Sequence, residues 1–317
     1  MSSFLTEKFF SMAIASFSLT VIAIVTIASI DSVGGDATIY LAYAKNFWDT
    51  PFSIRPNGPP EFGATGPLWV LWLSLFGDNF VLLKFFNFLV VCLSFYLGIR
   101  YLKFFYFLPL LILCLGSFIF MNALIYEAPL FLLILTCIFI NIFGSSNTFL
   151  TNSDYLLGLL IGFLIILRPE AIFLFPLILL NKQNGTLLIN LFMMILPIAI
   201  YQLYMFLGTG GEIIPSSIYE RIIRHGFGES NSSRSIFNVA ESFLEHIAKP
   251  LYLIGLFSLL LNTLRDKKWL SFFLSYLTFY IVLSLMDSPR WRYFLLLDLI
   301  AIFSISQSLY IFQISKS

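Results

Sequence analysis

Long apolar runs follow one another along almost the whole chain, and this feature decides what the chain can fold into. A helix needs about 20 apolar residues to cross a bilayer, and the sequence offers about ten runs approaching that length. Of the 317 residues, 11% are charged and 59% are hydrophobic, whereas a soluble domain has roughly 25% and 45–50%. The composition therefore excludes a soluble enzyme, a disordered chain and a basic nucleic-acid-binding protein. It predicts a polytopic membrane protein.

We expect an all-α membrane bundle of about ten spans, formed by one transmembrane domain over residues 1–317. The spans are expected at 9–30, 80–100, 104–121, 129–143, 154–167, 171–180, 187–207, 251–264, 269–286 and 293–313. The fourth, sixth and eighth are short for a full crossing. Two connections are much longer than the rest. We call them the first outer loop (residues 31–79) and the second outer loop (residues 208–250).

Basic residues in the short connections set the expected orientation, because Lys and Arg collect on the cytoplasmic side of a membrane. With the N-terminus inside, the cytoplasmic side receives Lys8, Arg100, Lys103, Lys182, Arg265, Lys267, Lys268 and Lys316. We therefore expect a cell (inner) membrane protein with both termini in the cytoplasm and both long loops outside. The three cysteines and two histidines show no metal-binding spacing, so no metal ligands are assigned.

The first outer loop contains two short segments that are typical of interfacial helices. Apolar and aromatic residues recur at steps of three and four over residues 37–47, as in an amphipathic helix lying at the membrane surface. Asp36 is expected to cap this helix. Pro67 is well placed to open a second interfacial or partly re-entrant helix over residues 68–76. Tyr43 and Trp69 on these segments are either sugar-stacking platforms or aromatic membrane anchors.

The same loop carries a recognisable set of motifs. Residues 36–39 (DATI), 43–46 (YAKN) and 63–69 (GATGPLW) resemble the first outer loop of the GT-C superfamily. These are integral-membrane glycosyltransferases that use polyprenyl-phosphate sugars. The closest likeness is to arabinofuranosyltransferase, protein mannosyltransferase and aminoarabinose transferase-like members. Gly35 stands where the family usually has the first acid of a pair, which weakens a two-carboxylate metal site. The sequence leaves open whether a divalent cation takes part.

Further segments resemble GT-C motifs in the same order along the chain. They are Lys84 with Asn87, residues 126–131 (YEAPLF), residues 167–171 (LRPEA), residues 214–220 (IPSSIYE) and residues 290–293 (RWRY). The resemblance therefore runs from about residue 9 to about residue 310. Each motif by itself is weak evidence for the resemblance, and the resemblance depends on the motifs occurring in the same order as in the family.

The resemblance implies a transfer of sugar to an acceptor hydroxyl at the outer membrane face, with inversion at the anomeric carbon. Such a reaction needs a carboxylate that takes the hydroxyl proton, and Asp36 is the candidate base. It also needs cations on the departing phosphate. The candidates for that role are Arg168, Arg290, Arg292 and Lys84. The candidates for the sugar or acceptor pocket are Tyr43, Trp69, Glu127, Glu170 and Tyr219.

Each of these residues also has a purely structural interpretation. Arg168 could form an ion pair with Glu127 or Glu170 inside the membrane, and Arg290 and Arg292 could extend to the interface beside Trp291. The implied partners are a polyprenyl-phosphate sugar and a lipid, glycan or protein acceptor, with no nucleic acid. The alternative function is a transporter or flippase. That class favours matched halves and polar groups near mid-membrane, whereas the charges here collect at the ends of the spans.

Overall fold

The structure is a computed structural model that describes residues 2–60, 63, 66–115, 125–144, 150, 153, 155–180, 186–211, 250–266, 269–285 and 295–314. Within these ranges the chain forms twelve helices and no strand. They are α1 (Ser2–Ala28), α2 (Gly35–Asn46), α3 (Pro67–Ser74), α4 (Phe80–Tyr101), α5 (Phe104–Leu115), α7 (Ala128–Phe143), α9 (Leu156–Leu167), η1 (Pro169–Leu180), α10 (Thr186–Thr209), α13 (Pro250–Arg265), α14 (Trp269–Leu285) and α15 (Leu295–Ile314). The all-α prediction is confirmed.

Each expected apolar run overlaps one of these helices, although residues 116–121 of the third run lie outside the described part of the chain. Three helical segments in the described part of the chain are long and apolar enough to cross a membrane, namely Lys8–Ala28, Phe80–Tyr101 and Leu187–Thr209. The other apolar helices are shorter. These three segments are compatible with a membrane protein. The expected total of ten spans stays a prediction.

The sixth run forms a 3₁₀ helix, η1, rather than an α-helix. A 3₁₀ helix rises about 2.0 Å per residue against about 1.5 Å in an α-helix. The 12 residues of η1 therefore extend about 24 Å instead of about 18 Å. Because of its larger rise per residue, this short apolar helix has most of the length needed to cross a hydrocarbon core of about 30 Å.

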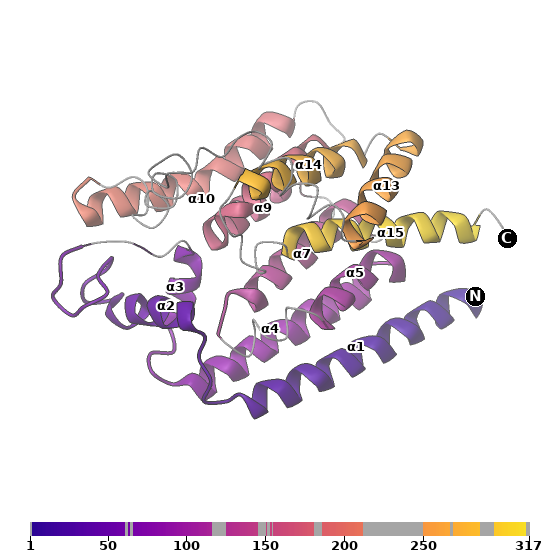
Figure 1. Ribbon diagram of the computed structural model, residues 1–317. Helices are drawn as coiled ribbons and strands as arrows, with labels where there is room; N and C mark the ends of the chain where they lie inside the picture. Colours follow the sequence, from indigo (N-terminus) through magenta and orange to yellow (C-terminus); the bar gives the residue numbers. More distant parts are fainter. Residues whose placement is uncertain are drawn as a thin grey trace.

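The helices lie side by side in a bundle, and the two interfacial helices sit at one of its ends (Figure 1). We call this the loop end. The C-terminal end of α10 and the N-terminal end of α4 also lie there. The N-terminal end of α1 and the C-terminal end of α15 lie together at the opposite end of the bundle. The helix packing thus separates the first outer loop from the two ends of the chain.

Close backbone contact joins α9 to α10. A Cβ atom added at Gly158 would collide with the backbone carbonyl of Asn190, and one at Gly162 would collide with that of Met194. The Asn190 side chain also accepts a hydrogen bond from the Gly158 N–H at 2.8 Å. Small residues at four-residue spacing allow membrane helices to approach in this way.

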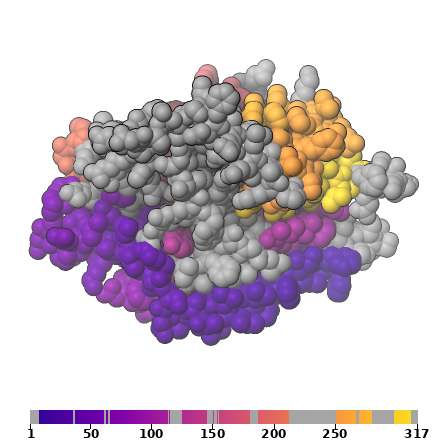
Figure 2. Space-filling view, viewed as in Figure 1, coloured from indigo at the N-terminus to yellow at the C-terminus, as the bar shows by residue number. Residues whose placement is uncertain are grey.

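Large apolar side chains face outward on α1. Phe9, Phe17 and Ile27 are 69%, 62% and 72% exposed, although each would be expected inside a soluble protein. Figure 2 shows the side chains of α1, in indigo, as a continuous surface along the lower edge of the molecule. A large apolar surface of this kind is suited to contact with lipid.

Both helices expected in the first outer loop are present, with one correction. α3 begins at Pro67 as predicted, because the fixed φ of proline suits the first helical position. α2 begins at Gly35, and its N-cap is Gly34, with no side-chain capping bond. The prediction that Asp36 caps this helix was therefore wrong. Asp36 lies one position further along, within the first turn, where a carboxylate is favoured by the helix dipole.

Replacing Gly158 with alanine should destabilise the protein, because the added methyl group collides with the Asn190 carbonyl and α10 must move away. We expect a cost of about 1–3 kcal/mol, seen as a lower Tm in detergent-solubilised protein. Gly35→Ala is the matched control, since a Cβ there meets no atom within 4 Å. Equal Tm values for the two variants would contradict the close packing of α9 and α10.

Candidate functional site

A buried arginine binds two carboxylates at the loop end of the bundle. Arg168 Nε lies 3.4 Å from Glu127 Oε1, and Arg168 Nη2 lies 3.2 Å from Glu170 Oε1. The side chains of Arg168, Glu127 and Glu170 are 6%, 7% and 19% exposed. We call this group the Arg168 triad. Both structural partners that the sequence offered to Arg168 are thus in contact with it.

Local sequence rules place the three residues of the triad. Arg168 ends α9 with extended backbone (φ −145°, ψ 109°), as expected for a residue that precedes a proline. Glu170 falls in the first turn of η1, and Glu127 occupies the N-cap position of α7. Negative side chains are favoured at the N-terminal ends of helices. Three helix ends therefore converge, with one cation between two acids.

The triad lies in an apolar environment with one formal negative charge in excess. The Arg168 guanidinium carbon lies 5.6 Å from the centre of the Phe131 ring, in a cation–π contact. Low dielectric strengthens the attraction within such a group and makes the removal of any partner costly. These contacts therefore hold the Arg168 guanidinium in place.

The first outer loop is attached beside this triad at two points. A Cβ at Gly34 would lie 2.7 Å from the Tyr126 hydroxyl oxygen, so only glycine lets Tyr126 pack there. A Cβ at Gly66 would lie 2.7 Å from the Leu167 carbonyl oxygen. Tyr126 and Leu167 are the immediate neighbours of Glu127 and Arg168 in the chain. The structure thus brings the start of α2 and the start of α3 to the triad.

Asp36 lies two residues beyond Gly34 in the first turn of α2. Its backbone is therefore at the loop end, the same end of the bundle as Arg168. Its side chain lies outside the described part of the structure. Arg290, Arg292 and Tyr219 also lie outside the described residues.

Lys84 is fully buried near the N-terminal end of α4 and is bonded to backbone. Its Nζ donates hydrogen bonds to the carbonyl oxygens of Ser29 and, at 2.9 Å, of Ser32. These carbonyls belong to the chain that leaves α1 and enters α2. Lys84 therefore fixes the position of the segment from which Asp36 follows.

Tyr43 and Trp69, the two candidate platforms, have different surroundings. The Tyr43 hydroxyl accepts a hydrogen bond from the Gly63 N–H at 2.7 Å, which ties α2 to the segment before α3. Trp69 is 0% exposed, and its indole Nε1 has no hydrogen-bond partner among the residues that the structure describes. Tyr43 also lines an apolar groove between α2, α3, α9 and α10, whereas Trp69 does not.

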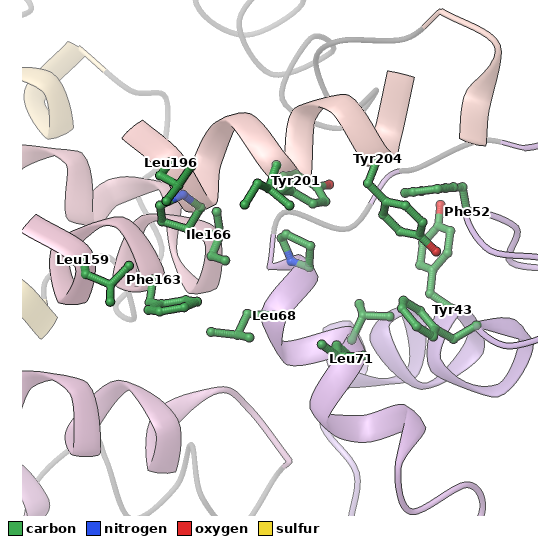
Figure 3. A pocket seen from close by; sticks show the side chains of 15 residues that line it. Tyr43, Phe52, Leu68, Leu71, Leu159, Phe163, Ile166, Leu196, Tyr201 and Tyr204 are labelled. Carbon is green, nitrogen blue, oxygen red and sulfur yellow. The ribbon is translucent and has the colours of Figure 1, made fainter. Parts of the chain in front are cut away.

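An apolar groove of about 410 Å³ runs between the interfacial helices and the pair α9–α10. Figure 3 shows Tyr43, Phe52 and Tyr204 at one end of it and Leu159, Phe163 and Leu196 at the other. The Phe52 and Tyr204 rings pack at a centroid distance of 4.9 Å. Ile166, two residues before Arg168, lines the groove, as does Pro67, which follows Gly66. The groove therefore borders the backbone that carries the triad.

Reasoning from the sequence missed this groove, because its lining residues are ordinary members of apolar runs. Phe163, Ile166 and Ile200 have the same character as side chains that face lipid. The one available signal was the pair Tyr201 and Tyr204, two phenols three residues apart on an apolar helix. Only the packing of α2 and α3 against α9 and α10 turns these residues into a cavity wall.

Comparison with known proteins adds no assignment. No family model matches the chain, and no match is found among curated proteins or among solved structures. Within the described ranges, no group of three or more His, Cys, Asp or Glu side chains is arranged to hold a metal ion. A functional interpretation of the site therefore depends on its own geometry and on the sequence motifs that form it.

Replacing Arg168 with glutamine should destabilise the fold strongly, because two buried carboxylates lose their cation. The expected cost is about 3–5 kcal/mol, measured by thermal or denaturant unfolding in detergent. Lys45→Gln is the control, since the Lys45–Asp78 pair is exposed and its loss should cost at most about 1 kcal/mol. Equal losses of stability would mean that the triad contributes no more than a surface ion pair.

Proposed function

We propose that this chain is a membrane glycosyltransferase. In this proposal it moves a sugar from a polyprenyl-phosphate donor to an acceptor hydroxyl at the outer face of the cell membrane. The observation that carries the proposal is the convergence at the loop end, where the first turn of α2, which contains Asp36, is packed beside the neighbours of Glu127 and Arg168. A candidate base and a fixed cation at one membrane border suit the transfer of a sugar from a lipid phosphate. The ordered GT-C-like motifs support the same function.

The proposed reaction is a single displacement. The acceptor oxygen forms a bond to the anomeric carbon as the bond from that carbon to the phosphate oxygen breaks, and the electron pair leaves with the phosphate. Asp36 takes the hydroxyl proton. Attack from the side opposite the leaving group inverts the anomeric centre. The lipid phosphate is the second product and requires cations rather than a proton.

Arginine is the residue type suited to the departing phosphate, because its planar guanidinium stays charged and can bind two oxygens at once. Arg168 is the candidate whose position is described, and Arg290 and Arg292 are proposed to join it. Lys84 is proposed to act indirectly, by holding the segment between α1 and α2 through its bonds to Ser29 and Ser32. Tyr219 remains a candidate for the acceptor pocket on the basis of its motif.

The proposed topology has ten crossings, with the loop end outside. The loop end also contains basic residues, among them Lys45 and Arg55 of the first outer loop, but long loops weigh less than short connections in setting orientation. Basic residues near the N-terminus and the short connections at the opposite end of the bundle support the proposed orientation. These residues are Lys8 on α1, Arg100 at the end of α4, Lys103 before α5 and Arg265 at the end of α13. Such a bias is typical of the cytoplasmic side. Both termini are therefore proposed to be cytoplasmic.

The apolar groove is proposed to take the isoprenoid chain of the donor. Its walls include Ile200 and Leu71, which are 61% and 38% exposed and would face hydrocarbon in a bilayer. A lipid chain could therefore enter the groove sideways from the membrane. Ile166 and Pro67 lead from the groove toward Arg168 and Gly66, so a phosphate at the end of the chain would lie near the triad.

Replacing Asp36 with asparagine should abolish transfer, because an amide cannot accept the proton at neutral pH. The assay is transfer from a radiolabelled polyprenyl-phosphate sugar to membrane acceptors in proteoliposomes. Asp49→Asn is the matched control, since Asp49 is an exposed acid of the same loop. Retained activity in Asp36→Asn, at normal protein levels, would remove Asp36 from the proposed role.

Filling the groove should weaken binding of long donors more than that of short ones. Leu159→Trp adds a large ring to the groove wall and is expected to lower affinity for undecaprenyl phosphate by roughly 10-fold or more, since each buried methylene contributes about 0.8 kcal/mol. Affinity for geranyl phosphate should change little. Leu188→Trp, at an exposed position of α10 outside the groove, is the control. An equal effect on both lipids would contradict a chain site here.

A further inference from the structure

One oxygen of the Arg168 triad has no hydrogen-bond partner among the residues that the structure describes. Glu127 contacts Arg168 through Oε1, whereas its Oε2 is buried and has no hydrogen-bond partner in the described part of the molecule. The side chain is only 7% exposed, so bulk water does not replace the missing donor. A buried carboxylate oxygen without a donor is costly, and such groups in native structures call for an explanation.

Helix capping does not supply that explanation. Glu127 stands at the N-cap of α7, where a side-chain oxygen commonly accepts a backbone N–H, yet it makes no side-chain capping bond. Pro129, at the second helical position, provides no N–H there. Glu127 Oε2 therefore accepts no hydrogen bond from the N-terminal N–H groups of α7.

The backbone before Glu127 is strained in a way that fixes this placement. Ile125 has a positive φ of 63°, which is unfavourable for a β-branched residue. Residues in such conformations persist where surrounding contacts hold them, and they cluster at functional sites. Here Tyr126 is held against Gly34 and Glu127 against Arg168. The strained turn at Ile125 is therefore held by contacts on Tyr126 and Glu127, and it sets the position of the Glu127 carboxylate.

We propose that Glu127 Oε2 accepts a hydrogen bond from a hydroxyl group of the donor sugar and so helps to select sugar-bearing lipids. This inference rests on the proposed function and adds a substrate contact to it. A hydroxyl fits better than a phosphate at this particular oxygen, because a carboxylate oxygen accepts a hydrogen bond from an O–H group and repels the oxygens of a phosphate. A carboxylate is also a strong acceptor for a neutral O–H in a site from which water is excluded.

The distinguishing experiment compares lipids with and without the sugar. Binding of undecaprenyl phosphate, and of undecaprenyl phosphates carrying arabinose, mannose or glucose, is measured to the full-length protein in detergent micelles. We define the sugar increment as the ratio of the Kd for the bare lipid to the Kd for the tightest-binding sugar lipid. In Glu127→Gln, which keeps an oxygen for Arg168 and loses the second acceptor, the increment should fall roughly 10-fold to 100-fold. Affinity for the bare lipid should stay within about twofold of wild type.

Asp78→Asn is the control, because it removes the exposed carboxylate that pairs with Lys45 and leaves Glu127 Oε2 in place. It should keep the sugar increment of the wild type. A structural role for Glu127 would lower affinity for the bare and sugar-bearing lipids together, and such a result overturns the inference. An unchanged increment in Glu127→Gln, or no increment in the wild type, also overturns it. Failure of the wild type to bind any of these lipids overturns the proposed function itself.

Discussion

The buried contact of Arg168 with Glu127 and Glu170 is the interaction on which the loop end of this protein depends. It joins the end of α9 to the starts of α7 and η1, three helices whose own surfaces are almost entirely apolar. Apolar packing brings helices together without directional bonds. The ion pairs add directional contacts, and breaking one would leave a buried charge without its partner. The triad therefore fixes the register of three helix ends at once.

Close contacts at two glycines join the first outer loop to the chain beside the triad. Gly34 admits the Tyr126 ring and Gly66 admits the Leu167 carbonyl, so both interfacial helices are packed directly onto the chain beside the triad. Lys84 secures the segment between α1 and α2 by donating hydrogen bonds to the carbonyl oxygens of Ser29 and Ser32. A polar corner built in this way is stiff, and stiffness is what a site must have to hold reacting groups within a fraction of an ångström.

A polar corner and an apolar groove next to each other suit an amphipathic substrate. The groove provides about 410 Å³ of nearly hydrocarbon surroundings between the interfacial helices and α9–α10, and the triad provides fixed charge at its border. The proposed donor, a lipid with an extended chain and a polar head, would fit both parts. A soluble sugar would leave the groove empty, and a simple lipid would leave the charged corner unused.

The sequence by itself determined the helices, because apolar runs of membrane length and the proline and glycine positions that end them are local properties. It also placed Pro67 at the start of α3 and offered Glu127 and Glu170 as partners of Arg168. It misplaced the cap of α2, assigned no 3₁₀ winding to η1 and gave no sign of the groove. Only tertiary structure decided that both acids bind Arg168 and that Lys84 binds the segment after α1. It also left Glu127 Oε2 without a hydrogen-bond partner among the described residues. The contacts of Arg168 with Glu127 and of Lys84 with Ser29 join residues tens of positions apart, and no local pattern encodes them.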